Sequence, residues 1–403
     1  MQANKICDPV HGFVRFNEIE RAVIDSIPFQ RLRYLRQMGV VYLLYPGANH
    51  SRFEHSLGVM ELASRIFDTI TYPSNLIDKK MIPSDQNELD YYRQILRLAA
   101  LCHDMGHLPF SHTAEKALLP LGGHERKTLT MIQSDSMRRI WEKISGKNVE
   151  NDIIKLAIKD HQLPLSPWER VLSQVITEDN FGADRIDYLL RDAYYTGVGY
   201  GHFDFKQMID TLRILPDRNQ LTIGVAESGI QSVESLWIAR YLMYARVYHH
   251  PTSRIYTHHM SRLMTLYYNH HGFPATPEGY LRQIDATILN FLLKAADDPI
   301  SYAYVDALAL LNRSPTYKMV EYEKIPDLDE LLRKFNGFVF IDQVDDIEKE
   351  RPPFLVLKEK GTIIPSYEES LFLRVIPHGG KKLRLYGAPD RVEALRKCVG
   401  SYH

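Results

Sequence analysis

The sequence predicts a mainly helical protein with a small α+β domain at its C-terminal end. From Ile19 to about Asn312, apolar residues recur at spacings of three and four, which is the period of amphipathic helices. After about Pro326 the pattern changes to short β-rich runs. Because a chain of 403 residues is too long for one ordinary core, we expect two domains. Their expected bounds are residues 1–325 for the helical domain and residues 326–403 for the α+β domain.

Individual elements follow from the same patterns. Two apolar stripes predict long helices, one made by Val59, Leu62, Ala63, Ile66 and Phe67 and the other by Ile95, Leu98, Ala99 and Cys102. Residues 73–87, rich in Pro, Ser, Asn and Asp, predict a surface loop between them. Residues 212–225 predict a hairpin that turns at Asp217-Arg218-Asn219. A final helix is expected from about Pro389 to Val399, after four strand-like runs, which are GFVFID, FLVLKEKGTII, LFLRVIP and KKLRLYG.

Composition and charge narrow the class of protein. The chain has 49 Lys plus Arg against 50 Asp plus Glu, so it lacks an overall basic field for nucleic acid. It has no run of eighteen apolar residues, and the polar segment MQANKICDPVHG lacks the apolar core of a secretory signal. Three widely spaced cysteines suit a reducing compartment. We therefore expect a cytoplasmic protein without membrane association. Nucleic-acid binding stays open, because an oligomer could form a basic groove that one chain does not show.

Histidine is unusually frequent, with 17 residues, and the pair His103-Asp104 is the first candidate for chemistry. The pair lies at the end of the second apolar stripe and before Gly106, where a glycine can end the helix and let both side chains face a cleft. An imidazole and a carboxylate together suit a hard or borderline divalent ion. Two ligands cannot make a tight site, and His55 and Asp184 are the best candidates to complete it.

Several segments extend this pattern and carry a family resemblance. HSRFEHSLGV, LCHDMGHLPFSH, His124-Glu125 and ADRIDYLLRDAYYTGV occur in this order, which resembles the HD-domain superfamily. With the segment FQRLRYLRQMGVVYLLYPGANHSRFEHS, the match is fuller to its deoxynucleoside triphosphate triphosphohydrolase branch, over roughly residues 8–250. The resemblance implies that the helical domain is an HD-domain bundle. It also implies a divalent metal, which could be Mn, Fe, Mg, Ni, Co or Zn, with the ligands His55, His103, Asp104 and Asp184.

The resemblance places further histidines beside the metal. These are His107, His112 and His124, and an imidazole near neutral pH can exchange protons or balance phosphate charge. We expect His112 and His124 to transfer protons or contact phosphate, with Glu115 or Glu125 orienting one of them. Glu115 stands where the family pattern has Asp, so its longer side chain leaves the partner of His124 open.

Charge and helical faces indicate the substrate-binding residues. A nucleoside triphosphate carries about four negative charges and needs cations, for which the candidates are Arg52, Arg185 and Arg240. Arg52 would share a helical face with His55, three residues later. Two sets follow the spacing i, i+4, i+8 and so line single helix faces, namely Asp184, Tyr188 and Asp192, and Arg240, Tyr244 and Tyr248.

The resemblance also implies roles for these residues. It implies phosphate contact for Arg240, contact with sugar and base for Tyr188 and Tyr248, and a hydrogen bond to the deoxyribose 3′-hydroxyl for Gln37. Arg185 replaces a family Lys and Tyr244 replaces a His, so base preference and substrate identity could differ. A tyrosine wall against the sugar would exclude a ribose 2′-hydroxyl.

A second nucleotide site is also implied by the resemblance. Asp25, Gln30 and Arg33 occupy positions that read a guanine at a subunit interface in the family. A carboxylate, an amide and a guanidinium can together satisfy a guanine edge. We therefore expect a guanine-nucleotide activator and a homo-oligomer, either a dimer or a tetramer. The alternative is that QRLRYLRQ forms an ordinary solvated helix face.

The expected reaction is hydrolysis of a dNTP to deoxynucleoside and inorganic triphosphate. The same kind of metal site could instead serve another phosphorylated nucleotide, such as a monophosphate, a cyclic nucleotide or an alarmone. A non-catalytic nucleotide sensor is least favoured, because all four metal ligands and His124 are present. Ten other histidines have no partner in the pattern and are expected at the surface or in caps, namely His11, His50, His161, His202, His249, His250, His258, His259, His270 and His271.

Overall fold

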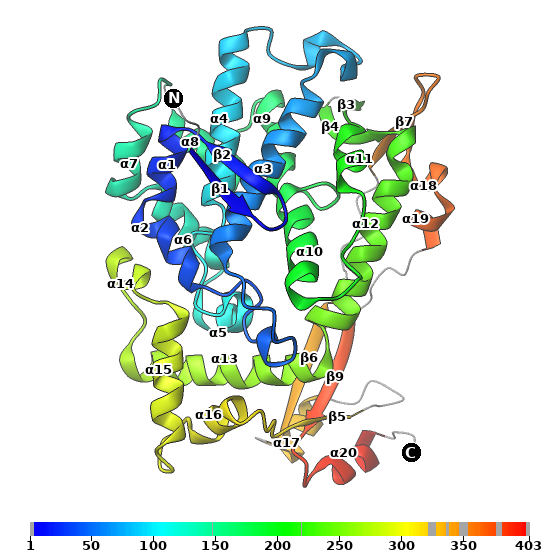
Figure 1. The fold of residues 1–403 in the computed structure, drawn as a ribbon. Coiled ribbons are helices and arrows are strands. Elements are labelled where there is room, and N and C mark those ends of the chain that lie inside the picture. The colour runs from blue at the N-terminus through cyan, green and yellow to red at the C-terminus, as the bar shows by residue number, and fades with distance from the viewer. Residues whose placement is uncertain are drawn as a thin grey trace.

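Long helices form the centre of the molecule in a computed structural model that describes residues 4–146, 148–218, 220–320, 328–335, 338–345, 354–375 and 381–399 (Figure 1). At the middle, α3 (Arg52–Ile70) packs against α4 (Gln86–Cys102) and α10 (Ala183–Thr196). Next to them lie α8 (Val149–Ala157) and α9 (Pro167–Thr177). One large apolar core joins these helices, and it contains members of both predicted stripes, including Leu62, Ile66, Leu98 and Cys102.

Local sequence sets the ends of the helices that carry the site. α3 begins at Arg52 because Ser51 and Glu54 form a capping box, in which Glu54 Oε1 accepts the backbone N–H of Ser51 at 2.8 Å. α10 ends at Thr196 and is capped by Gly197, whose φ of 74° is a left-handed conformation that glycine adopts without strain. The predicted loop between α3 and α4 is present and includes two 3-10 turns, η3 (Pro73–Asn75) and η4 (Lys79–Met81).

Shorter elements cover the core. The N-terminal hairpin pairs β1 (Asn4–Asp8) with β2 (Gly12–Phe16), and β2 contacts α3. Further short helices are α1 (Glu18–Ile24), α2 (Ile27–Gln30), η1 (Arg31–Tyr34), η2 (Val41–Leu43), η5 (Ser111–Ala114), α5 (Glu115–Leu118), α6 (Gly123–Ile132), α7 (Asp135–Trp141), α11 (Phe205–Asp210) and η6 (Glu227–Gly229). Several site residues, such as His112 in η5 and His124 in α6, lie in these short helices.

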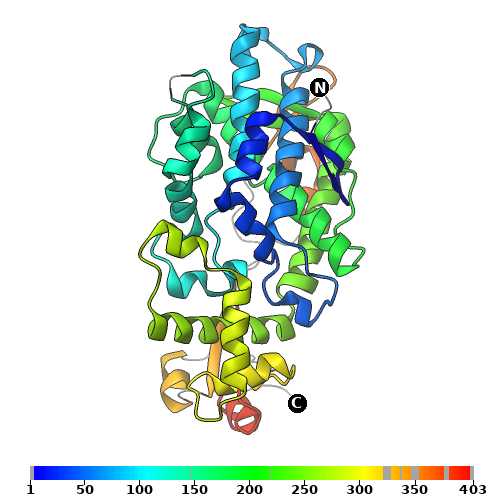
Figure 2. The same cartoon turned by 60° about the vertical axis from the view of Figure 1, so that its left-hand side comes forward.

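A second group of helices closes one end of the bundle. α12 (Ile230–Met243) continues through η7 (Tyr244–Tyr248) into α13 (Pro251–His271), which runs across that end in both views (Figures 1 and 2). α15 (Asp285–Ala296) and α16 (Tyr304–Leu311) pack against α13, and α14 (Pro277–Leu281) precedes them. These helices bury a separate apolar cluster that includes Met260, Leu263 and Leu292.

Two small sheets contain most of the β-rich runs. The hairpin of β3 (Leu212–Asp217) and β4 (Gln220–Ala226) is extended by β7 (Leu355–Leu357), which is parallel to β4, and then by β8 (Ile363–Pro365). The other sheet has the order β5-β9-β6, made by β5 (Lys318–Val320), β9 (Lys381–Gly387) and β6 (Val339–Asp345). α17 (Leu328–Lys334) and α20 (Val392–Val399) pack on this sheet. In both sheets a strand that precedes residue 325 pairs with one that follows it, β4 with β7 and β5 with β9. The division into two domains at this residue therefore stays a prediction.

The mainly helical fold with a small C-terminal α+β region is confirmed, as is the hairpin of β3 and β4, although Asn219 lies outside the described residues. The strand expected over LFLRVIP is wrong. α19 (Leu371–Val375) occupies this part, directly after α18 (Ser366–Glu369), and residues 376–380 lie outside the described residues. A short apolar run does not separate strand from helix, and Ser370 Oγ accepts the N–H of Leu373 at 3.0 Å, as a helix cap does.

Membrane association was not expected from the sequence. Within the ranges that the structure describes, none of the helices combines the length and the apolar character that crossing a bilayer requires.

Candidate metal centre and active site

The four residues predicted to bind a metal come from three helices and lie together. His55 is in the first turn of α3, His103 and Asp104 follow the end of α4, and Asp184 is in the first turn of α10. His55 Nε2 lies 3.0 Å from Asp184 Oδ1 and 3.5 Å from Asp104 Oδ2. His103 Nε2 lies 3.4 Å from Asp104 Oδ1 and 3.8 Å from Asp184 Oδ1. Ligand atoms of His55, His103 and Asp104 fall within 4.8 Å of one another, a spacing that one ion can bridge.

Hydrogen bonds orient both imidazoles for metal binding. His55 Nδ1 lies 2.8 Å from Asp187 Oδ2, and His103 Nδ1 lies 2.7 Å from the carbonyl oxygen of Ala100. Because both partners are acceptors, the proton of each neutral imidazole sits on Nδ1 and Nε2 keeps its lone pair. Both Nε2 atoms are buried without a hydrogen-bond partner. The residues present therefore fit a metal ion, which would satisfy both nitrogens.

The charge of the centre also fits a divalent cation. Four carboxylates and two guanidinium groups belong to the network of ion pairs that includes His55, namely Asp8, Asp104, Asp184, Asp187, Arg52 and Arg191. With neutral imidazoles, two negative charges remain, and a divalent ion would balance them. Burial lowers the pKa of His55, but the nearby carboxylates of Asp184 and Asp187 outweigh burial and raise this pKa to about 10. That rise reflects the same excess of negative charge.

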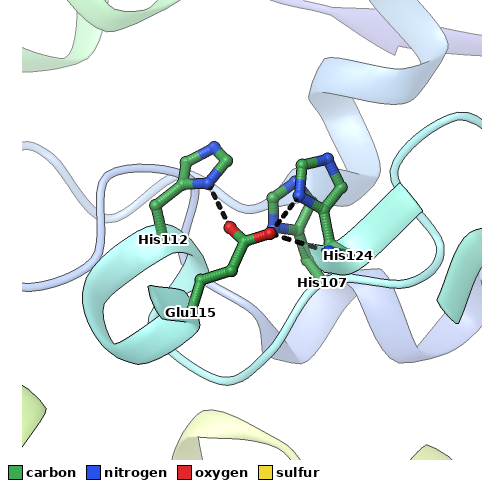
Figure 3. Close-up of side chains that lie close together, drawn as sticks. All are labelled: His107, His112, Glu115 and His124. Atoms are coloured by element: carbon green, nitrogen blue, oxygen red, sulfur yellow. Dashed lines mark hydrogen bonds and ion pairs between the residues drawn. The ribbon is translucent and has the colours of Figure 1, made fainter. Parts of the chain in front are cut away.

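Three histidines and Glu115 form a second cluster beside the metal ligands (Figure 3). Glu115 Oε2 lies 2.6 Å from His112 Nδ1, and Oε1 lies 2.7 Å from His124 Nδ1. The rings of His107 and His124 stack with centroids 3.8 Å apart. The structure thus brings Glu115 to both predicted proton-transfer residues, whereas Glu125 accepts the backbone N–H of Asp160 at 3.4 Å. The four clustered residues could also hold a cation themselves.

Electrostatics differ within this cluster. Burial raises the pKa of the Glu115 carboxyl, but hydrogen bonds from His112 and His124 outweigh it and hold this pKa well below its ordinary value. Burial and the charge of Arg52 lower the pKa of His107. His112 is about two-thirds exposed, with 65% of its side chain accessible, and lines the cavity described next. Glu115 is therefore ionised and His107 is neutral near pH 7.

The loop after His107 is held in a strained conformation. Phe110 and Ser111 have φ values of 55° and 58°, in the left-handed region that residues other than glycine rarely adopt. Asp285 of α15 accepts the backbone N–H of Phe110 at 2.8 Å. Ser111 Oγ accepts from Arg52 Nε at 2.8 Å. Contacts with α15 and α3 therefore fix the loop that places His112.

A cavity of about 480 Å³ opens over both clusters, and its size suits a small-molecule ligand. Most of the predicted site residues line it, namely Gln37, Arg52, His103, Asp104, His107, His112, His124, Glu125, Asp184, Tyr188, Asp192, Tyr244 and Tyr248. His55, Glu115, Arg185 and Arg240 are not among its lining residues. Sequence patterns missed the other lining residues, among them Lys159, Ser253, Arg254 and Thr257, since single residues outside a motif carry no signal.

Asp192 organises the aromatic side of the cavity. Its Oδ2 accepts from the Tyr248 hydroxyl at 2.7 Å, and its Oδ1 lies 2.7 Å from His50 Nε2. The Tyr248 ring lies 5.0 Å from the Tyr244 ring and 6.2 Å from the Tyr188 ring, measured between centroids. The surface position expected for His50 is wrong, because this residue is only 2% exposed.

The helix that carries these tyrosines changes its period. α12 ends at Met243, and η7 is a π-helical turn in which the N–H of His249 donates to the carbonyl of Tyr244 at 2.9 Å. Such turns are frequent at functional sites. The single α-helical face expected for Arg240, Tyr244 and Tyr248 is therefore wrong in its last turn. The Arg240 guanidinium instead lies over the Tyr244 ring, 5.4 Å from its centroid.

Cationic side chains gather around Asp179, near the same tyrosines. Arg185 Nη2 donates to Asp179 Oδ1 at 3.0 Å, and Lys159 Nζ lies 3.7 Å from Asp179 Oδ2. Arg185 Nε lies 3.4 Å from the Tyr188 hydroxyl. Arg185 Nη1 and Arg240 Nε are buried without a hydrogen-bond partner. Such unsatisfied guanidinium groups suit an anionic ligand.

The residues predicted to bind an activating guanine lie at the surface around α2. Gln30 Oε1 accepts from Arg33 Nε at 2.9 Å, and the Arg33 guanidinium lies 3.4 Å from the centroid of the Phe53 ring. Asp25 pairs with Arg21 at 3.4 Å. The structure therefore brings Gln30 and Arg33 together and gives Asp25 another partner within the chain.

Two further histidines are buried, so their expected surface positions are wrong. His11 Nε2 lies 2.6 Å from Asp187 Oδ1, and His259 Nδ1 lies 2.8 Å from Asp306 Oδ1. The partners are 176 and 47 residues away in the chain, so local patterns do not signal these pairs. His250 caps α13, as expected for this group.

Comparison with known proteins places this arrangement in a family. The HD domain model matches residues 52–192, which hold all four predicted ligands, and a model described as the HD associated region matches residues 203–333. The solved structure of a hypothetical protein from Aquifex aeolicus is 31% identical, with a TM-score of 0.79 over 98% of this chain and 99% of that chain.

Curated relatives agree with the match. The Bacillus subtilis protein YwfO is 30% identical and covers 98% of this chain and 93% of its own length. The deoxynucleoside triphosphate triphosphohydrolase SAMHD1 of Bos taurus is 30% identical over 62% of this chain and 45% of its own length. The chain spans about half the length of several curated relatives that it matches. By these matches and by the donor set of its site, the chain belongs to the HD-domain family of metal-dependent phosphohydrolases.

Proposed function

We propose that this chain hydrolyses deoxynucleoside triphosphates to deoxynucleoside and inorganic triphosphate. One observation carries the proposal: a single cavity, lined by three of the four metal ligands and by the histidine cluster, also reaches Gln37 and the wall of Tyr188, Tyr244 and Tyr248. Such a cavity can hold phosphate at one side and a nucleoside at the other. The likeness to SAMHD1, whose name states this reaction, supports the same substrate class.

The proposed chemistry needs a metal ion, a proton donor and a carboxylate that orients this donor. When bound by His55, His103, Asp104 and Asp184, a divalent ion supplies a Lewis acid for a phosphate oxygen and lowers the pKa of water. Hydrolysis forms a bond from the water oxygen to the α-phosphorus and breaks the bond from this phosphorus to the 5′-oxygen. In the proposal, His124 gives the 5′-oxygen its proton through Nε2 and regains one from the attacking water, because Glu115 holds its Nδ1 at 2.7 Å.

Other residues bind the substrate in this proposal. Arg52, beside Asp104 in the cavity wall, meets the charge of the phosphates. Arg185 and Arg240 offer further guanidinium N–H groups near the tyrosines. Gln37 lines the cavity and is proposed to bond the deoxyribose 3′-hydroxyl. Tyr188 and Tyr248 are proposed to enclose the sugar and exclude a 2′-hydroxyl.

Product identification tests this function. The purified protein is analysed for bound metal and then incubated with each of the four dNTPs, and the phosphate product is identified. We expect inorganic triphosphate, and we expect it to disappear in His103→Ala and Asp104→Ala. Release of orthophosphate, or no reaction, would overturn the dNTP assignment. Such a result would direct the search to monophosphates, cyclic nucleotides or alarmones, which the same kind of metal site can serve.

Activation by a guanine nucleotide and oligomerisation are a separate part of the proposal. Gln30 and Arg33 lie side by side at the surface and offer an amide and a guanidinium to a guanine edge. Light scattering with and without dGTP measures the mass of the assembly. An unchanged mass together with unchanged activity would remove the activator, and Arg33→Ala should abolish any change that does occur.

A further inference from the structure

The buried carboxylate of Asp187 connects the metal centre to the N-terminal hairpin. Asp187 lies one turn after Asp184 in α10 and is fully buried. Its Oδ1 accepts from His11 Nε2 at 2.6 Å and from Arg191 Nη2 at 2.9 Å. Its Oδ2 accepts from His55 Nδ1 and Arg191 Nε, both at 2.8 Å. Four donors therefore fix the orientation of this carboxylate.

The hairpin adds a second buried carboxylate to the same network. Asp8 Oδ2 accepts from Arg191 Nη1 at 2.7 Å. Asp8 Oδ1 accepts the backbone N–H groups of Val10 and His11 at 2.9 and 2.8 Å, so it also shapes the turn between β1 and β2. Asp8, His11 and Arg191 are all buried. Their interactions are shielded from water and are therefore stronger than those of surface pairs.

A glycine in α3 makes room for this network. Gly58 lies one turn after His55, and a Cβ at this position would overlap Asp187 Oδ1 and lie 2.5 Å from Arg191 Nη2. Glycine in a helix interior costs about 1 kcal/mol relative to alanine. The close approach of the Asp187 and Arg191 side chains is the physical reason for a glycine here.

We propose that the turn from Asp8 to His11 is the outer support of the metal centre. His11 and Arg191 fix Asp187, and Asp187 fixes the His55 imidazole with Nε2 toward the ion. An acceptor on the second nitrogen of a ligating histidine orients the ring and makes the ligating nitrogen more basic. His11 is thus a positioning residue that acts through Asp187. This role rests on the proposed function, in which His55 binds the metal.

The test compares two buried His–Asp pairs, of which one reaches the metal centre. His11→Phe keeps a ring but removes the donor to Asp187, and His259→Phe makes the same change at the pair with Asp306, outside the cavity lining. Each full-length variant is stripped with a chelator, and Mn²⁺ binding is measured by calorimetry. We expect about 10- to 100-fold weaker binding in His11→Phe and unchanged binding in His259→Phe. His11→Gln, whose amide can still donate, should recover most of the affinity.

A second readout separates positioning from general stability. The absorption spectrum of bound Co²⁺ reports the geometry of its ligands, and we expect it to change in His11→Phe and to stay constant in His259→Phe. Thermal unfolding in excess chelator measures the stability of each variant without the ion. If folded His11→Phe binds Mn²⁺ with the affinity and the Co²⁺ spectrum of the parent protein, the positioning role is overturned.

Two more variants keep the outcomes distinct. His55→Ala should remove one Mn²⁺ from the stoichiometry that calorimetry measures, and if it does not, the metal assignment in the proposed function is wrong. If His55→Ala loses the ion and His11→Phe does not, the assignment stands and only the outer support is overturned. Should His11→Phe fail to fold, Asp8→Asn carries the test, because it weakens the hold on Arg191 and leaves Asp187 and His55 in place. Unchanged Mn²⁺ affinity in Asp8→Asn would then overturn the role.

Discussion

Arg254 and Asp342 form an ion pair that ties the C-terminal sheet to the wall of the active-site cavity. Arg254 Nε lies 2.9 Å from Asp342 Oδ2, and Arg254 Nη2 contacts Asp342 Oδ1. Arg254 lines the cavity from α13, whereas Asp342 lies in β6. A two-point contact of this kind fixes the plane of the guanidinium. β6 therefore determines where one positive charge of the cavity is placed.

Asp342→Asn should raise KM for the substrate with a smaller effect on kcat, because Arg254 would lose its charged partner and its fixed position. The free energy of unfolding should fall by about 1–3 kcal/mol, since Asp342 is buried and Arg254 is partly exposed. Steady-state kinetics and denaturant unfolding measure the two effects. Glu393→Gln breaks an exposed pair in α20 and serves as the control. An unchanged KM in Asp342→Asn would contradict the positional role of β6.

Glu115→Gln should lower kcat by about 10²- to 10⁴-fold, the range for general acid–base groups. The substitution keeps the shape of the side chain but removes the charge that holds His112 and His124. Glu125→Gln should cost less, since this carboxylate contacts the backbone of Asp160 instead. Rates of product formation with saturating substrate measure both variants. Equal losses would show that Glu115 does not orient the histidines.

Tyr248→Ala should reduce the preference for dGTP over GTP, because the ring is proposed to press against the sugar. We expect the ratio of the two kcat/KM values to fall by about tenfold, which corresponds to about 1.4 kcal/mol. Tyr248→Phe keeps the ring and loses the bond to Asp192, so it should change the ratio less. Tyr241→Ala, at a partly exposed tyrosine of α12, is the control. If the parent protein hydrolyses GTP as fast as dGTP, the sugar wall is wrong.

Acid should destabilise the chain through His258. Burial, with the nearby charges of His259 and Arg262, lowers the pKa of His258 to about 4, against about 6.5 in an unfolded chain. Between these values the unfolded state binds more protons, so stability falls as pH falls from about 6.5 toward 4. The contribution to the change between pH 7 and pH 5 is about 2 kcal/mol. His258→Phe, which keeps the stack on Phe340, should remove this part of the pH dependence of unfolding.

Removal of the metal should lower the midpoint of thermal unfolding, and Mn²⁺ should restore it. An ion that binds only the folded chain stabilises it by about 2.7 kcal/mol at 100 times its Kd. In Asp184→Asn, most of the stabilisation by Mn²⁺ should be lost, since an amide is a weaker metal ligand than the carboxylate of Asp184. Asp306→Asn, at a buried acid outside the site, should lower stability and keep the increment. Scanning calorimetry with and without chelator measures both, and an Mn²⁺ increment retained in Asp184→Asn would exclude this residue as a ligand.

The sequence predicted the parts of the site that lie in motifs. The ordered motifs and the family resemblance pointed to His103, Asp104 and Asp184, and the helical spacing in α10 put Tyr188 and Asp192 on the same face as Asp184. The contact of Asp187 with His11 joins α10 to the N-terminal hairpin, 176 residues away. Such pairs depend on tertiary packing, which periodicity does not encode. For the same reason β7, only three residues long, could not be assigned to β4 as its partner.

Because of the π-helical turn Tyr244–Tyr248, the tyrosine wall of the cavity depends on the number of residues in this segment. The turn holds one more residue than an α-helical turn would, and the Tyr248 hydroxyl reaches Asp192 from this wider path. Deleting one residue here would restore the regular helix and rotate every following side chain by about 100° about the axis. The cap at His250 and the start of α13 would rotate with it. Homologues should therefore vary this segment by substitution, and insertions or deletions should be confined to the loops outside it.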